Sequence, residues 1–122
     1  MTEEDNIHRV FVYGTLRPKD ESYNYLPATH VLWGYAMYNY YYKFPYIEKA
    51  DARDYVVGNI IEVDDDGLAN LDVYEGVHNN LYSRIKVTVE SIDDVSHKDE
   101  EVWVYVADEI SLKVKQGDWA NV

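Results

Sequence analysis

Two short segments of the sequence carry residue types that could do chemistry without a cofactor. The first runs from Tyr13 to Pro18 and directly follows a run of β-branched and aromatic residues. A glycine at the end of a strand lets consecutive backbone N–H groups point toward one place, so Gly14 and its neighbours could bind an anion such as a carboxylate. An ordinary turn between a strand and a loop has the same sequence features, and this segment alone does not decide between them.

The second segment is Leu71 to Gly76, which contains Glu75 near the expected end of a short helix. Among apolar neighbours, desolvation would raise the pKa of this glutamate above its ordinary value of about 4.3. A carboxyl group with a raised pKa can take up and release protons near neutral pH, as a general base and acid must. The alternative is a solvated glutamate at a helix end.

Other common signatures of a reactive site are missing from the sequence. The chain has no cysteine, which excludes disulfides, thiolate metal sites and cysteine nucleophiles. Its glycines form no nucleotide-binding pattern, no serine lies in a nucleophile elbow, and the four histidines form no zinc pair. Asp64 to Gly67 is an acidic turn rather than a calcium loop, because Val73 stands where the bidentate acid should be. We therefore predict neither a metal nor a cofactor.

The charge balance argues against two classes of partner. Lys and Arg number 11 against 23 Asp and Glu, which gives a net charge of −12. Such a polyanion binds phosphate backbones and anionic membranes poorly, so we expect no nucleic acid and no membrane as partner. The acidic N-terminus is unlike a signal peptide, and the charge-free stretch Val31 to Tyr42 is too short for a membrane helix. These features favour a cytoplasmic protein.

Strand patterns dominate the sequence and must position the two segments. The content of hydrophobic residues, 47%, suffices for a packed core, and 122 residues favour one domain, 1–122. β-branched and aromatic runs, or alternating apolar and polar residues, predict strands at Arg9–Tyr13, within Val31–Tyr42, and at Tyr55–Val63, Leu81–Val89 and Val102–Ala107. Proline should interrupt any ladder at Phe44-Pro45. The polar stretch Glu90 to Glu101 predicts a solvated hairpin loop.

Helices are predicted to be few and short. Apolar residues recur at helical spacing behind acidic residues that could cap the helix, and Gly76 should end it: Leu68, Leu71 and Tyr74 follow Asp65 and Asp66. The stretch Tyr23 to Ala28 is at most a short helical piece, because Pro27 ends or bends such segments. The expected class is therefore α+β, built on a strongly curved or closed sheet.

The two candidate segments together resemble the γ-glutamylcyclotransferase-like family, which includes γ-glutamylamine cyclotransferases and the AIG2-like and YtfP-like proteins. A Tyr-Gly-Thr-Leu-Arg motif combined with a downstream Asp-x-x-Glu-Gly and Tyr-x-Arg is more specific than any one of these pieces. The matches cover nearly the whole chain: Val10 to Pro18, Asn24, Leu26, Phe44-Pro45, Gly58, Glu62-Val63, Leu71-Asp72, Glu75-Gly76, Tyr82-Ser83-Arg84, Trp103-Val104-Tyr105 and Gly117-Asp118-Trp119.

The resemblance implies a fold, a reaction and roles for individual residues. The fold is a small mixed β-barrel with short surrounding helices and a cavity at its mouth. The reaction is an acyl transfer that releases 5-oxoproline and a free amine from a γ-glutamylamine or γ-glutamyl peptide, with Glu75 as general acid and base. Substrate would be bound by Tyr13, Gly14, Thr15, Leu16 and Tyr105. The small-molecule substrate is the implied partner, and the oligomeric state stays open.

The stretch Tyr35 to Tyr46 departs from the family pattern, because it contains six tyrosines. Tyrosine is favoured at binding surfaces, so this stretch could select the leaving amine. In an alternative of another class, the protein is a non-catalytic module that uses the same pocket and this aromatic region to hold a peptide or protein. A sheet face covered with half-buried tyrosines is the third interpretation.

The substrate's α-carboxylate would need local positive groups or amides inside an acidic protein. Arg17 and Arg84 lie nearest to the two motifs in sequence. Each could offset this charge, or could instead be a structural partner of a carboxylate, which is the interpretation we favour.

Overall fold

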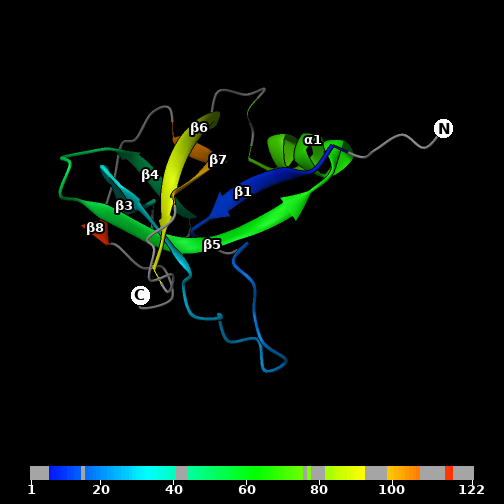
Figure 1. Cartoon of the computed structure of the whole chain (residues 1–122), viewed down its shortest axis with the longest axis horizontal. Coiled ribbons are helices and arrows are strands. Elements are labelled where there is room, and N and C mark those ends of the chain that lie inside the picture. The colour runs from blue at the N-terminus through cyan, green and yellow to red at the C-terminus, as the bar shows by residue number, and fades with distance from the viewer. Residues whose placement is uncertain are drawn as a thin grey trace.

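A closed barrel of five strands is the centre of the structure (Figure 1). This computed structural model describes residues 6–14, 16–40, 44–75, 77, 82–92, 99–107 and 115–116. Around the barrel the order is β1-β5-β2-β6-β7, with bounds His8–Val12, Tyr55–Val63, His30–Trp33, Tyr82–Ser91 and Asp99–Ala107. The pairing of β1 with β7 is parallel and the other pairings are antiparallel. The predicted mixed β-barrel is therefore confirmed.

A second, three-stranded sheet has the order β4-β3-β8, with bounds Phe44–Lys49, Tyr35–Tyr40 and Lys115–Gln116. Figure 1 shows it at the opposite side of the molecule from the helix α1. Met37 of β3 and Ile47 of β4 are fully buried and share one core cluster with barrel residues such as Phe11 and Leu32. The small sheet thus covers part of the barrel core.

Strand β4 corrects the expectation that Phe44-Pro45 interrupts any ladder. Pro45 lies within β4 and is paired with Asn39 of β3. Because β4 is an edge strand of its sheet, a proline there need not break a ladder on both sides. The stretch Val31–Tyr42 forms two strands as predicted, although they belong to different sheets and are separated by Gly34, which has a left-handed φ of 85°.

Strand β5 has the predicted bounds and changes partner along its length. Residues 59–63 pair with β1, and residues 55–58 pair with β2. Gly58 lies at this change of partner, where a side chain would overlap the carbonyl oxygen of Val12 and press on the Phe11 ring. A glycine inside a strand often marks such a close backbone approach at a barrel corner.

The hairpin of β6 and β7 is longer than the sequence predicted. Its register runs from Tyr82 opposite Ala107 to Glu90 opposite Asp99. The expectation of a loop over all of Glu90 to Glu101 was therefore wrong at both ends, and residues 93–98 lie outside the described part. Polar residues such as Glu101 point outward here while the backbone ladder continues, so polarity alone did not indicate a loop.

The α-helix of the described residues is α1, Asp65–Tyr74, which lies beside β1 and β5 (Figure 1). Its N-cap is Asp64, one residue before the two expected caps, and the Asp64 side chain accepts a hydrogen bond of 2.7 Å from the Gly67 N–H. Leu68 is buried, but Tyr74 is 66% exposed and does not share the buried face as predicted. Gly76, the expected stop, lies outside the described residues.

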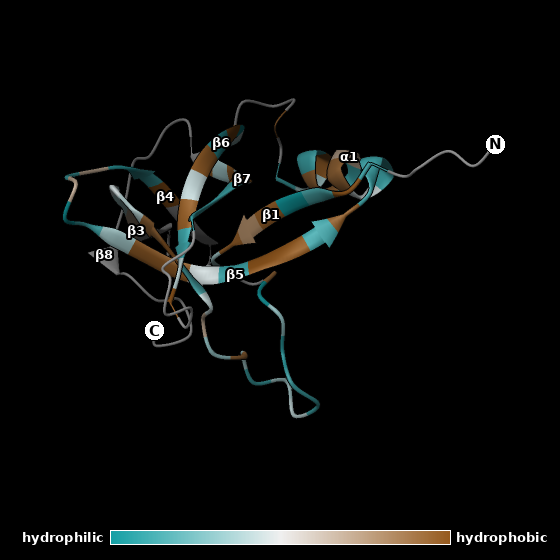
Figure 2. Ribbon diagram, in the orientation of Figure 1, coloured by the Kyte–Doolittle hydropathy of each residue, from teal (hydrophilic) through white to brown (hydrophobic). Residues whose placement is uncertain are grey.

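The stretch Tyr23 to Ala28, expected to be at most a short helical piece, is not helical. It belongs to the loop between β1 and β2, which projects away from the barrel in Figure 1 and is coloured mostly as hydrophilic in Figure 2. The Asp20 carboxylate accepts hydrogen bonds from the Ser22 and Asn24 backbone N–H groups, which favours a turn over a helix. Within the described ranges, no helix has the length and apolarity needed to span a bilayer.

We predict that replacing Gly58 with alanine destabilises the protein by about 3 kcal/mol or more, because a rigid backbone oxygen blocks the added methyl group. Urea unfolding measures the effect. Gly34→Ala is the control: it strains a left-handed backbone but meets no neighbouring atom within 4 Å, so about 1 to 2 kcal/mol is expected. If Gly58→Ala lowered the free energy of unfolding no more than Gly34→Ala does, the close approach of Gly58 to the Val12 carbonyl would be contradicted.

Candidate active site

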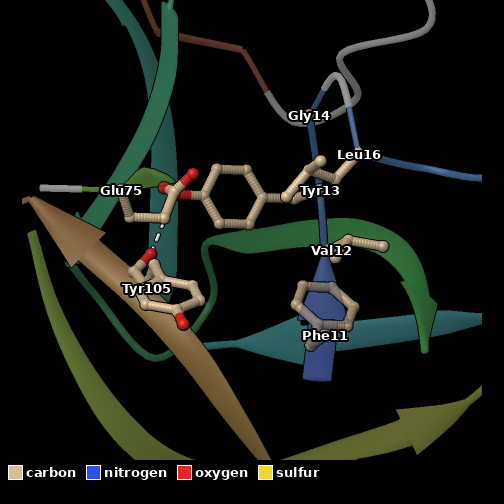
Figure 3. Close-up of a pocket in the computed structure, with 7 residues that line it drawn as sticks. All are labelled: Phe11, Val12, Tyr13, Gly14, Leu16, Glu75 and Tyr105. Atoms are coloured by element: carbon tan, nitrogen blue, oxygen red, sulfur yellow. Dashed lines mark hydrogen bonds between the residues drawn. The ribbon is translucent and has the colours of Figure 1, made fainter. Parts of the chain in front are cut away.

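A pocket opens where the end of β1, the following turn, the C-terminal end of α1 and β7 meet (Figure 3). Its volume is about 50 Å³, several times the roughly 10–15 Å³ that a single water needs. It is lined by Phe11, Val12, Tyr13, Gly14, Leu16, Glu75 and Tyr105. The pocket therefore brings together five of the six site residues that the sequence suggested. The sixth, Thr15, lies outside the described residues.

Strand β1 delivers the turn to the pocket. Its residues Val10, Phe11 and Val12 are almost completely buried, as expected for a strand covered on both faces. The chain turns directly afterwards, and the Arg17 N–H donates to the Gly14 carbonyl at 3.0 Å. Gly14 and Leu16 of this turn thus line the pocket, as expected for the candidate binding segment.

The Tyr13 side chain crosses the pocket toward Glu75 (Figure 3). Its hydroxyl donates a hydrogen bond of 2.8 Å to the Tyr105 carbonyl. Burial raises the pKa of Tyr13 well above its ordinary value, and the charges of Tyr82 and Glu75 add to this effect, while a backbone hydrogen bond with Ile47 opposes it. Tyr13 therefore stays protonated and acts as a hydrogen-bond donor.

Glu75 caps the C-terminal end of α1, and its backbone N–H donates to the Leu71 carbonyl at 2.8 Å. Burial in the pocket raises the pKa of its carboxyl group from 4.5 to about 7. At neutral pH the carboxylate and the carboxylic acid are then present in similar amounts. A group in this state can accept a proton in one step and return it in the next.

Tyr105 lies on β7 and is almost fully buried. Figure 3 shows its hydroxyl directed away from Glu75, and this hydroxyl donates to Asp72 Oδ1 at 2.6 Å. Burial raises the pKa of Tyr105, the hydrogen bond and negative charge of Asp72 raise it further, and Arg84 acts in the opposite direction. Tyr105 thus lines the pocket with its hydroxyl already engaged by Asp72.

Asp72 is a residue of the site to which the sequence analysis assigned no role. Arg84 of β6 binds its carboxylate with both Nε and Nη2, at 2.8 and 3.1 Å. The spacing to Glu75 was the available signal, because residues three apart share one helix face. The Arg84 guanidinium also lies 4.3 Å from the centre of the Trp103 ring, and Arg84 does not line the pocket. These contacts agree with the interpretation that Arg84 is a structural partner of a carboxylate.

Arg17 is also absent from the pocket wall. It is buried and donates from Nε to Asn59 Oδ1 at 2.9 Å and from Nη2 to the Leu26 carbonyl at 3.0 Å. Asn59 in turn donates to the Pro27 carbonyl at 3.0 Å. Arg17 therefore fastens the projecting loop to the barrel.

The structure bears on two further interpretations from the sequence. Within the described residues, no three His, Cys, Asp or Glu side chains gather closely enough to hold a metal ion. In the tyrosine-rich stretch, Tyr35 packs against the main core cluster. The side chains of residues 38–46 lie outside the described part, so a role of these tyrosines in selecting a leaving group stays a prediction.

Comparison with known proteins points to one family. The sequence model described as "Gamma-glutamyl cyclotransferase, AIG2-like" matches residues 10–121. A Methanocaldococcus jannaschii protein named "Putative gamma-glutamylcyclotransferase MJ1514" is 33% identical over 120 residues, which is 92% of this chain and 95% of that protein.

Solved structures share the fold. The solution structure of At5g39720.1 from Arabidopsis thaliana superimposes with a TM-score of 0.65 at 26% identity, covering 83% of this chain and 68% of that one. A structure titled "Gamma-glutamyl cyclotransferase" gives a TM-score of 0.61 at 18% identity, with 90% and 70% covered, and at this identity it shows the fold alone.

The raised pKa of Glu75 predicts a characteristic dependence of stability on pH. Between about pH 4.5 and 7 the unfolded chain releases this proton while the folded protein keeps it, so folding loses stability as the pH rises, by up to about 3 kcal/mol. Glu75→Gln removes this loss. We expect the variant to gain stability relative to the native protein between pH 5 and 8, measured by urea unfolding. A difference that does not change with pH would contradict the burial of the Glu75 carboxyl.

Proposed function

Because the chain belongs to the gamma-glutamyl cyclotransferase, AIG2-like family, we propose that it releases 5-oxoproline and a free amine from γ-glutamylamines or γ-glutamyl peptides. One observation carries the proposal: the Glu75 carboxyl group, with a pKa near 7, lies in the pocket that the turn after β1 also lines. A desolvated carboxyl group whose pKa matches neutral pH is suited to moving protons.

The reaction needs only the atoms of the substrate. The α-amine attacks the γ-carbonyl carbon, a new C–N bond closes the five-membered ring, and the bond from that carbon to the leaving nitrogen breaks. Two protons pass overall from the α-ammonium nitrogen to the leaving nitrogen, and neither water nor a second reactant is consumed. Holding the substrate folded for this intramolecular attack can itself supply much of the rate acceleration.

Glu75 is the proposed carrier of these protons. As a carboxylate it accepts a proton from the α-nitrogen, and as a carboxylic acid it donates a proton to the leaving nitrogen. The position of Glu75 among Tyr13, Tyr105 and apolar side chains supports this role, because little bulk water competes for the proton there.

The backbone of the turn is the proposed substrate clamp. No Lys or Arg is among the described residues that line the pocket, and backbone N–H groups can bind the substrate's α-carboxylate without a charged side chain. Tyr13, Gly14 and Leu16 line this wall, and Thr15 is included from the sequence. Their backbone N–H groups are the proposed donors. They would bind the carboxylate or the oxyanion that develops on the γ-carbonyl. Tyr105 would contribute the opposite wall.

We predict that Glu75→Gln lowers turnover by at least about 100-fold while the fold and substrate binding persist, because glutamine has similar volume but its amide neither gains nor loses a proton near neutral pH. Mass spectrometry would detect 5-oxoproline after incubation with a panel of γ-glutamylamines and γ-glutamyl peptides. Glu62→Gln is the matched control: its carboxylate is exposed and pairs with Arg9, and neither residue lines the pocket. Activity of the Glu75 variant close to that of the control would exclude Glu75 as the acid and base.

The rate should also depend on pH through Glu75. The carboxylate form starts the reaction, so we expect kcat/KM to rise with pH along a limb centred near 7, the pKa of this group in the free protein. The measurement is a pH profile with the best substrate of the panel. A limb near 4.5 would mean that the catalytic carboxyl group is solvated, contrary to the pocket geometry.

A further inference from the structure

The last turn of α1, which carries Glu75, has few apolar attachments to the barrel. Leu68 is the buried residue of the helix, and it lies nearly two turns before Glu75. Val73 and Tyr74, directly before Glu75, are 69% and 66% exposed. Leu71 packs against the smaller core cluster, as does Val77 two residues after Glu75, so the apolar contacts around this turn rest on two partly buried side chains.

Asp72 supplies a polar attachment for the same turn. Its Oδ1 accepts from the Tyr105 hydroxyl at 2.6 Å and from Arg84 Nε at 2.8 Å, and its Oδ2 accepts from Arg84 Nη2 at 3.1 Å. Its partners lie on two neighbouring barrel strands, β6 and β7, which pair at Arg84 and Tyr105 themselves. One carboxylate thus fastens the helix end to two residues that face each other across a ladder.

The anchor is itself held in place. The Arg84 guanidinium stacks on Trp103, and Lys86 lies above the same ring at 4.5 Å. Tyr105 is nearly fully buried, and its backbone carbonyl accepts a hydrogen bond from the Tyr13 hydroxyl. Tyr105 therefore cannot shift without disturbing the pocket wall. A bidentate Arg–carboxylate pair fixes orientation as well as distance.

We propose that Asp72 is a positioning residue, which through Arg84 and Tyr105 holds the last turn of α1 against the barrel and thereby keeps Glu75 inside the pocket. The effect of Asp72 on turnover rests on the proposed function, whereas its effect on the position of Glu75 does not. Without the anchor, Glu75 moves toward solvent. Its carboxyl group then loses both its desolvation and its alignment with the substrate.

The charged and titratable groups around Glu75 determine how this movement can be measured. Tyr13 from the end of β1 and Tyr105 from β7 interact electrostatically with Glu75, and Tyr82 from β6 interacts with Tyr13. Asp72 and Arg84 lie beyond Tyr105. Removal of Asp72 therefore also removes a negative charge near Glu75, which by itself lowers the pKa of Glu75. The experiment must separate this charge effect from the loss of position.

Two substitutions at one site make this separation. Asp72→Asn removes the charge but keeps an acceptor oxygen for Tyr105 and Arg84, whereas Asp72→Ala removes both the charge and the anchor. The Glu75 carboxyl pKa is read from its ¹³C chemical shift in an NMR titration. We expect the pKa to fall from about 7 toward 4.5 in the alanine variant and to fall by at least about one unit less in the asparagine variant. Equal shifts, or no shift, would overturn the proposal.

Asp65→Ala is the matched control at the opposite end of the same helix. Asp65 accepts a hydrogen bond of 2.6 Å from the His8 ring, so its loss also unfastens a carboxylate from a barrel strand. We expect no change in the Glu75 pKa from this variant. A shift equal to that of Asp72→Ala would mean that any loosening of α1 has the same effect, which would also overturn the proposal.

A second variant covers the case in which Asp72→Ala does not fold. Tyr105→Phe deletes only the hydroxyl that donates a hydrogen bond to Asp72. This hydroxyl points away from Glu75 (Figure 3). It leaves the Asp72 charge in place, so a fall in the Glu75 pKa would reflect lost position. An unchanged Glu75 pKa in Tyr105→Phe would count against the anchor.

Turnover adds a readout that depends on the proposed function. We expect Asp72→Ala to lower kcat on the order of 100-fold, with the acid limb of the pH profile displaced downward and a smaller change in KM, and Asp72→Asn to restore most of the rate. Equal kcat for the two variants would overturn the kinetic part. If the native protein released no 5-oxoproline, the proposed function would fail, and the NMR comparison would still decide the role of Asp72.

Discussion

The parallel pairing of β1 with β7 is the contact on which the site depends, because it closes the barrel. It joins a strand near the start of the sequence to one near its end, and brings Tyr13 beside Tyr105 with a hydrogen bond between hydroxyl and carbonyl. The helix α1, inserted between β5 and β6 in the chain, then ends against this closure. Three segments that are remote in sequence meet only because the barrel closes here.

The second sheet takes part in this arrangement. Ile47 of β4 is fully buried in the main cluster, and its backbone forms a hydrogen bond with Tyr13. Tyr13 is therefore held from two sides, by β4 and by β7, and its ring has little freedom in the pocket. Glu75 faces a rigid wall, since such doubly bonded buried groups cannot rearrange without leaving a polar atom unsatisfied.

Sequence patterns predicted those helices and strands that are determined by the residues of the segment itself. The apolar run of β1, the β-branched run of β5 and the helical spacing behind Asp65 and Asp66 each identify an element from its own residues. Pro45 in an edge strand and Glu90 in a long hairpin depend instead on what lies beside the strand, which one segment cannot reveal. The family resemblance supplied the barrel and the pocket residues, whereas the partners of Asp72 emerge only when β6 and β7 are paired.

Asp72 and Glu75 lie three residues apart on one helix face, but their carboxyl groups have opposite environments. Asp72 accepts hydrogen bonds from the Tyr105 hydroxyl and from two nitrogens of the Arg84 guanidinium group, which compensates the burial of its charge. Glu75 is desolvated, and its carboxylate is correspondingly disfavoured. The folded protein therefore gains attachment at Asp72 and loses stability at Glu75 above pH 4.5. Environments that differ in this way suit neighbouring carboxyl groups to distinct roles: Asp72 to attachment of the helix and Glu75 to the proposed proton transfer.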